Sequence, residues 1–114
     1  MPQHKSAEAE TFEITRLHHL RAKIFQALAD PVRLGILDFL KAGEKCVCEI
    51  VAAFPRRQPT ISKHLSTLYE VGILDKRVEG RSVYYRVRDQ RIYEVIKVAE
   101  EITIKPLLEV AEKL

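Results

Sequence analysis

Residues 59–72, "PTISKHLSTLYEVG", combine a narrow apolar stripe with a small polar face, and no acid stands between Pro59 and Tyr69. Ile61, Leu65 and Leu68 follow one another at helical spacing, which predicts one buried face. Pro59 suits the first turn of a helix, and Gly72 suits its end. The outward positions hold threonine, serine, lysine and histidine, whereas an ordinary solvated helix carries long acidic and basic side chains. This helix is therefore a candidate binding surface.

The segment that follows this helix changes from helical to strand periodicity. Residues 73–78, "ILDKRV", and 82–87, "SVYYRV", are rich in β-branched and aromatic side chains. Gly80 between them suits a hairpin turn. Tyr84 and Tyr85 alternate across the second strand, so we expect one of them in the core and the other on the surface.

Two helices are predicted upstream. Residues 46–54, "CVCEIVAAF", are expected to form a short apolar helix that stops at the basic turn "PRRQP". Residues 29–44, "ADPVRLGILDFLKAGE", are expected to form another, which Asp30 caps, Pro31 opens and Gly43 ends. The predicted inner face of that helix consists of Val32, Ile36, Leu37 and Leu40.

Both ends of the chain are amphipathic. Residues 10–29 carry apolar side chains at helical spacing, and so do residues 90–114, where Pro106 marks a kink or a new first turn. Residues 1–9 are polar and aperiodic, which predicts a flexible tail. The order of elements predicts one mainly α domain with a small β-hairpin, a winged helix-turn-helix over residues 10–114.

Positive charge is concentrated in the middle of the chain. The net charge of the 114 residues is only +3, but residues 56–91 hold nine lysines and arginines against four acids. A basic centre is what a phosphate-binding surface needs, and a solvated charged face is the alternative. No apolar run is long enough to span a bilayer and no signal-type stretch opens the chain, so we expect a cytoplasmic protein with no membrane partner.

A short helix, a tight turn, a second helix with small outward side chains and a basic hairpin form the layout that places a helix in the major groove of double-stranded DNA. We expect Arg81 at the hairpin tip to reach the minor groove or the backbone, and Lys76 and Arg77 to contact phosphates. For His64, a DNA contact and a capping or packing role both stay open. The predicted DNA-binding residues are Arg56, Arg57, Gln58, Thr60, Ser62, Lys63, His64, Ser66, Lys76, Arg77 and Arg81.

Four segments, "FQALADPVRLGILDFL", "CVCEIV", "QPTISKHLSTLYEVGIL" and "VEGRSVYYRV", together resemble the ArsR/SmtB family of metal-responsive transcriptional repressors. The resemblance covers residues 25–87 in continuous order. It implies a homodimer built from the helices over residues 10–29 and 90–114. It also implies a palindromic DNA operator that the repressor leaves when an inducer binds.

The two cysteines of the chain, Cys46 and Cys48, are separated by one valine. They resemble the first two cysteines of arsenic-sensing family members, and Val51 stands where those proteins have a third. Since thiolates favour soft ions, the resemblance implies As(III), Cd(II), Pb(II) or Zn(II) as an inducer, with no ion required for the fold. Residues two apart diverge on a regular helix, so chelation is expected to distort its first turn and a direct disulfide to strain it. Thiol oxidation and plain packing are the alternatives for the pair.

Further ligands are expected, if anywhere, in the N-terminal segment, because related sensors supply cysteines or histidines there. The candidates are His4, His18 and His19, for which a disordered tail position or an ordinary surface position is the alternative. The family's other metal site lies on the terminal helix. Asp89 falls near its expected acid, but Arg91 stands where a histidine would follow, so we expect no ion there.

The predicted function is a sequence-specific DNA-binding repressor whose operator binding is relieved by a thiophilic ion at the cysteine pair. The same fold could instead respond to thiol oxidation or to no inducer, or serve as a protein-interaction adaptor. An adaptor helix would expose apolar or aromatic anchors, and a thiol oxidoreductase would need CxxC spacing in a βαβ setting. Ser62 and His64 cannot face each other two residues apart on a helix, so we expect no hydrolytic enzyme.

Overall fold

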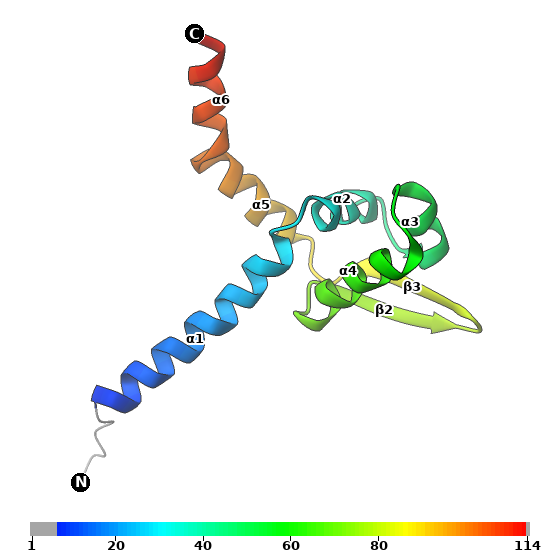
Figure 1. Ribbon diagram of the computed structural model, residues 1–114, viewed down its shortest axis with the longest axis horizontal. Coiled ribbons are helices and arrows are strands. Elements are labelled where there is room, and N and C mark those ends of the chain that lie inside the picture. The colour runs from blue at the N-terminus through cyan, green and yellow to red at the C-terminus, as the bar shows by residue number, and fades with distance from the viewer. Residues whose placement is uncertain (1–6, 114) are drawn as a thin grey trace.

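The structure of the chain is a computed structural model that describes residues 7–113. The described residues form a small body of three helices and a sheet, from which two helical arms project (Figure 1). The elements are α1 (Ala7–Leu28), α2 (Pro31–Leu40), β1 (Lys45–Cys46), α3 (Val47–Ala53), α4 (Gln58–Glu70), β2 (Leu74–Glu79), β3 (Ser82–Val87), α5 (Arg91–Ile102) and α6 (Ile104–Lys113).

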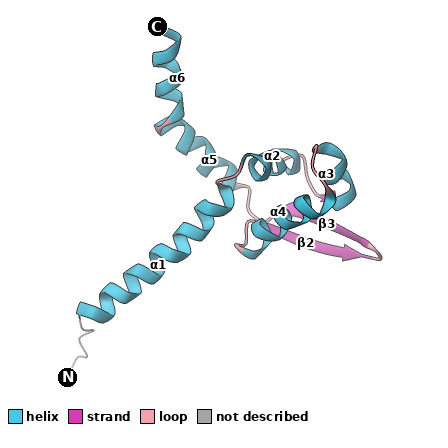
Figure 2. Ribbon diagram, in the orientation of Figure 1, coloured by secondary structure: helices cyan, strands magenta, loops and turns pink. Residues whose placement is uncertain are grey.

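The body consists of α2, α3 and α4 packed against the sheet (Figure 2). Its core comes from all of these elements, and Ile61, Leu65 and Leu68 of α4 are completely buried in it, as their spacing predicted. The other large side chains with almost no exposed surface are Ile36, Leu37, Leu40, Ile50 and Leu74. The core therefore fixes the orientation of α4, because that helix can turn only its apolar stripe inward.

The sheet has three antiparallel strands in the order β1–β3–β2. The predicted hairpin is confirmed: β2 pairs with β3, and Gly80 connects them with φ of 61°. The prediction missed β1, a two-residue strand that pairs Lys45 with Tyr85 and Cys46 with Tyr84. Tyr85 is buried and Tyr84 is half-buried, in agreement with the alternation of the strand.

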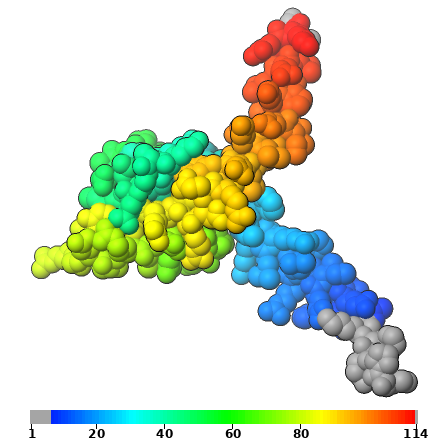
Figure 3. All heavy atoms as spheres, turned by 180° about the vertical axis from the view of Figure 1, so that it is seen from behind, coloured from blue at the N-terminus to red at the C-terminus, as the bar shows by residue number. Residues whose placement is uncertain are grey.

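The first arm is α1, and the second arm is α5 followed by α6. Both leave the body at the same end, and the space-filling view shows them as separate projections (Figure 3). Their apolar side chains are largely exposed in the single chain. The large exposed ones are Phe12, Ile14, Leu17, Leu20, Ile24, Phe25, Val95, Val98, Ile102, Ile104, Leu107, Leu108 and Val110. No helix of the described part of the chain has the length and apolar composition required to cross a bilayer.

The arms differ from the predicted boundaries in two places. Helix α1 begins at Ala7, so residues 7–9 are helical rather than part of a tail, and residues 1–6 lie outside the described residues. The predicted terminal helix is broken at Thr103 into α5 and α6. Pro106 lies in the first turn of α6, so it marks a new first turn and not a kink within one helix. Its missing N–H costs nothing there, because the first N–H groups of a helix have no partner within the helix.

Asp30 caps α2 as predicted. Its Oδ2 accepts hydrogen bonds from the backbone N–H of Val32 at 2.9 Å and of Arg33 at 3.1 Å. The hydrogen bond from the Arg33 backbone is the main reason why the pKa of Asp30 lies below its ordinary value. The charged carboxylate is therefore stabilised by the folded state, as expected at a helix N-terminus.

We expect Asp30→Asn to reduce the free energy of unfolding by about 0.5 kcal/mol at pH 7, because asparagine keeps the cap but loses the favourable charge. The pKa of this carboxyl is lower in the folded than in the unfolded protein. Such a group stabilises the protein at pH values above its unfolded pKa, and this stabilisation is lost as the pH falls through its folded pKa. The difference in the free energy of unfolding between Asp30→Asn and wild type should therefore be constant between about pH 5 and 7. It should disappear as the pH falls below about 4. Urea unfolding at one protein concentration measures it.

Asp38→Asn is the matched control, since Asp38 is exposed near the opposite end of the same helix. Removing a negative charge there should leave the protein equally stable or slightly more stable. Equal losses in the two variants would contradict the assigned role of Asp30.

Candidate nucleic-acid interface and cysteine site

The polar face of α4 is directed to solvent. Thr60, Lys63 and Ser66 are exposed, while Ser62 and His64 are half-buried at the edges of the helix. The preceding turn presents Arg56 and Arg57 to solvent as well. The orientation follows from the burial of the apolar stripe, and it leaves short polar and basic side chains on one accessible surface.

A cavity of about 520 Å³ joins the start of α4 to the wing, which is the β2–β3 hairpin. Gln58 and Ser62 line it from α4, and Arg81 lines it from the wing tip. Cys46 and Cys48 line the same cavity. Three of the predicted DNA-binding residues and both cysteines therefore meet at one place, although 35 positions separate Cys46 from Arg81 in the sequence.

A second hollow of similar volume lies on the other side of α4. Thr60, Lys63 and His64 line it together with Arg33 of α2. Arg33 was absent from the predicted interface. Its position in the first turn of α2 carried no local signal of a contact with α4, because that contact depends on how the two helices pack.

The basic side chains on strand β2 have partners within the chain. Arg77 forms ion pairs with Glu44, at 2.8 Å, and with Glu79, and it stacks over the ring of Tyr84. These two carboxylates raise the pKa of Arg77 above its ordinary value. Lys76 has its Nζ 4.5 Å from the centre of the Tyr69 ring. To contact a phosphate, Arg77 would have to exchange these carboxylates for it.

The two cysteines form a disulfide, with Cα atoms 5.3 Å apart. The prediction that both lie within a helix, where the sulfurs diverge, is wrong. Cys46 is the last residue of β1 and has extended backbone angles, so that α3 begins only at Val47. The extended residue lets the two side chains approach each other. Cys46 is buried and Cys48 is exposed.

Cys46 also caps α3. Its Sγ accepts a hydrogen bond from the backbone N–H of Glu49 at 3.2 Å, and Oε1 of Glu49 accepts one from the backbone N–H of Cys46 at 3.1 Å. This reciprocal pair is a capping box in which a sulfur takes the place of the usual hydroxyl. The role of Glu49 was not predicted. The spacing of three residues between a cap residue and a glutamate is the pattern that could have indicated it.

The two predicted additional ligands that the structure describes, His18 and His19, do not join the cysteine pair. Within the described residues no group of three or more histidines, cysteines and acids is close enough to hold one metal ion. His18 and His19 are exposed on α1, and His4 lies outside the described residues. Val51, at the position of the family's third cysteine, is half-buried and packs against the core. In its reduced form the pair thus supplies two sulfur donors from one protomer.

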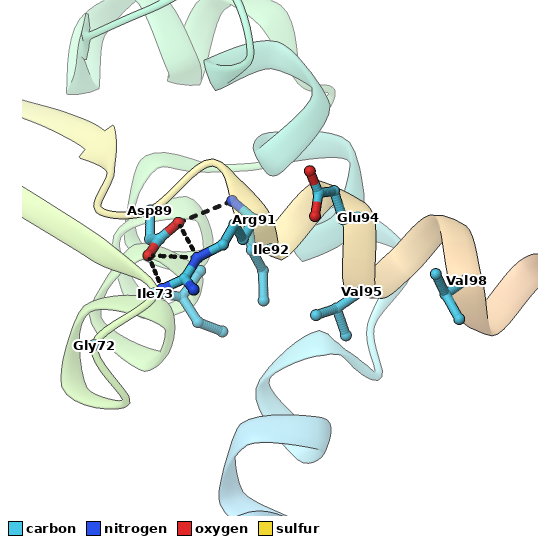
Figure 4. A pocket seen from close by; sticks show the side chains of 8 residues that line it. All are labelled: Gly72, Ile73, Asp89, Arg91, Ile92, Glu94, Val95 and Val98. Carbon is cyan, nitrogen blue, oxygen red and sulfur yellow. Dashed lines mark hydrogen bonds and ion pairs between the residues drawn. The ribbon is translucent and has the colours of Figure 1, made fainter.

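The second site considered, at the start of α5, is occupied by an internal ion pair. Both carboxylate oxygens of Asp89 accept hydrogen bonds from the Arg91 guanidinium, and Oδ1 also accepts one from the Arg91 backbone N–H (Figure 4). The Arg91 side chain lowers the pKa of Asp89 to about 2. Here an arginine binds the carboxylate that a metal ion would need.

The known proteins to which this chain is similar are transcriptional regulators. A family model described as "Bacterial regulatory protein, arsR family" matches residues 30–76. An HTH-type transcriptional regulator of Methanocaldococcus jannaschii is 44% identical over 82 residues, which are 71% of this chain and 92% of that protein. The arsenical resistance operon repressor of Escherichia coli is 45% identical over 60% of this chain, and the matched part spans 59% of the repressor.

Among solved structures, this chain is similar to the homodimeric winged helix-turn-helix DNA-binding domain of a possible ArsR-family regulator from Mycobacterium bovis. The TM-score is 0.72 at 28% identity, and 92% of each chain is covered. The predicted winged helix-turn-helix fold and the resemblance drawn from residues 25–87 are both confirmed.

We expect Glu49→Ala to lower the free energy of unfolding by about 1 kcal/mol, because it removes half of the capping box at the start of α3. Glu49→Gln should retain most of the stability, since its amide oxygen can still accept from the Cys46 N–H. Urea unfolding without reductant, which keeps the disulfide, measures both. An equal loss in the two variants would mean that Glu49 acts through its charge and not as an acceptor.

Proposed function

The chain belongs to the ArsR family of bacterial transcriptional regulators, and from this premise we propose that it is a dimeric repressor that binds double-stranded DNA through α4 and the wing. The observation that carries the proposal is the polar face of α4, which holds no acid between Pro59 and Tyr69, beside Arg81 of the wing tip. Short side chains can enter a major groove and reach base edges, while the wing arginine reaches the backbone or minor groove.

The DNA contacts divide into two kinds. Gln58, Thr60, Ser62 and Ser66 offer hydrogen-bonding groups that can read base edges. The basic side chains that are exposed around them are suited to phosphates, which position a protein without reading sequence. These are Arg56, Arg57, Lys63 and Arg81, and Lys76 and Arg77 would join them after leaving their internal partners.

The two arms support dimer formation. Apolar side chains such as Leu17, Leu20 and Val98 are exposed along α1 and α5, far more than a monomeric surface of this size tolerates. Pairing of the same arms about a two-fold axis would cover them in both protomers. A two-fold dimer presents two copies of α4, so its operator would be palindromic. The M. bovis relative named above is itself a homodimer.

We further propose that the reduced cysteine pair binds a thiophilic ion, As(III), Cd(II), Pb(II) or Zn(II), and that this relieves DNA binding. An ion bound by Cys46 would take its sulfur away from the Glu49 N–H and so uncap α3. The cavity at this point is shared with Gln58, Ser62 and Arg81, so a change in α3 would act directly on the DNA contacts. The E. coli relative, an arsenical resistance operon repressor, supports arsenite among these ions.

Ion binding has two requirements. The disulfide must first be reduced, a condition that a reducing cytoplasm would provide. Any third ligand would come from the partner protomer, for which His18, His19 and His4 are the candidates.

A second candidate response, thiol oxidation, is favoured by the Cys46–Cys48 disulfide itself. In that case hydrogen peroxide would accept two electrons and two protons from the dithiol, leaving the disulfide and two molecules of water. The regulator would then sense an oxidant instead of an ion, with the same two sulfur atoms and the same neighbouring DNA contacts.

We expect Arg81→Ala to weaken binding to every duplex about tenfold and to reduce the slope of log affinity against log salt by about 1, because one phosphate contact is lost. Thr60→Ala should instead reduce the discrimination between operators and mismatched duplexes. Fluorescence titration with operators selected from a random library, at several salt concentrations, measures both effects. Unchanged affinity of Arg81→Ala for random duplex would show that the wing is misassigned.

Titration of the reduced protein–operator complex with each of the four ions should release DNA and produce thiolate-to-metal absorption with at least one of them. Cys46→Ser/Cys48→Ser is the control, which should bind DNA and ignore the ions. Ion sensing fails if reduced wild type stays bound throughout. Release by peroxide in metal-free buffer would then favour the oxidation response.

A further inference from the structure

The guanidinium of Arg33 connects three helices. Its Nε donates to the carbonyl oxygen of Ala27 at 2.6 Å, and its Nη2 donates to that of Gln26 at 2.9 Å. Both carbonyls belong to the last turn of α1, which has no basic residue of its own. Its Nη1 lies 3.1 Å from Nδ1 of His64 in α4. Arg33 itself stands in the first turn of α2.

His64 is held from both sides of its ring. Arginine has no acceptor, so Nδ1 must accept from Arg33, which places the imidazole proton on Nε2 in the neutral ring. Nε2 lies 3.9 Å from Oδ2 of Asp30, the oxygen that caps α2. Of the two roles left open for His64, these contacts are those of the packing role, and its side chain is only 16% exposed.

These contacts lie where α1 joins the body. Of the α1 residues, which all belong to the described chain, only Ala27 and Leu28 are buried. The rest of the helix runs away from the body (Figure 1). The direction of α1 relative to α4 is therefore determined at its last turn, where Arg33 binds two carbonyls.

We propose that Arg33, His64 and Asp30 are positioning residues that fix the angle between α4 and α1, and that they thereby set the half-site spacing that the dimer accepts. The inference rests on the dimeric DNA-binding function proposed above. If α1 forms the two-fold interface, the separation of the two α4 helices depends on the angle at which each leaves α1. Operators read by paired helices have half-sites about one helical turn apart, so a small change of this angle moves one helix out of its groove.

Three roles for these residues make different predictions. If His64 contacted a base, its removal would reduce discrimination between bases at one position of the operator. A phosphate contact by Arg33 would be retained by Arg33→Lys, which keeps the charge, so that variant would show the wild-type salt slope and the wild-type spacing. A positioning role changes neither of these quantities and instead widens the range of spacings that the dimer binds.

The test uses full-length protein and a library of duplexes in which two identical half-sites are separated by spacers of every length. Wild type should select a narrow range of spacers. Arg33→Lys keeps the charge but lacks the fork that reaches three acceptors, and His64→Ala removes the ring. Both variants should accept a wider range of spacers and bind the preferred operator about tenfold more weakly, with unchanged base preference and salt slope.

Two variants serve as controls. His64→Gln offers an oxygen to Arg33 and should restore the narrow range. Lys63→Ala changes an exposed neighbour on α4, and should lower the salt slope without changing the spacing. Arg33→Lys is the milder change, so it still tests the inference if His64→Ala fails to fold. The helical content of each variant is compared by circular dichroism.

The inference is overturned if Arg33→Lys and His64→Ala keep the wild-type spacing, or if they lose base discrimination or salt slope instead. Wild type that binds no duplex at low salt would refute the DNA-binding function, and this inference with it. If wild type binds DNA and the variants accept the same narrow range of spacers, this inference is refuted and the DNA-binding function is not.

Discussion

Burial of one stripe of α4 is the constraint on which the interface depends. Ile61, Leu65 and Leu68 have no exposed surface, so the rotation of the helix about its own axis is fixed by the core. Every other side chain of α4 takes the direction that remains. Thr60, Lys63 and Ser66 are accessible because they lie away from this stripe, and Ser62 and His64 are half-buried because they lie beside it. The body therefore acts as a rigid base that presents one polar helix face.

The cysteine pair lies next to three of the predicted DNA-binding residues, in a shared cavity. The start of α3, the start of α4 and the wing tip meet there, so the proposed ion site would need no long pathway to influence the proposed DNA contacts. The arms carry a different connection. Arg33 ties α1 to α4, and Tyr93 of α5 donates a hydrogen bond to the carbonyl of Leu37 in α2. Both arms are thus anchored to the body by a polar side chain as well as by packing.

Local sequence patterns were sufficient for most of the fold. The cap at Asp30, the buried stripe of α4 and the hairpin at Gly80 each depend on residues close together in the chain, and all three are as predicted. The errors concern contacts between distant segments. Cys46 was assigned to a helix because its pairing with Tyr84 of β3 leaves no periodic trace. The contact of Arg33 with His64 was missed for the same reason, since 31 positions separate the two residues.

Cys46 belongs to a strand and to a helix start at the same time, and both duties are performed by atoms that serine also has. The strand pairing uses only its backbone, and the cap needs only a side-chain atom that accepts a hydrogen bond. Exchange of sulfur for oxygen at this position would abolish thiol chemistry while leaving the architecture in place. A regulator that senses an ion in the way proposed could therefore lose that response by one substitution at Cys46 and keep its fold.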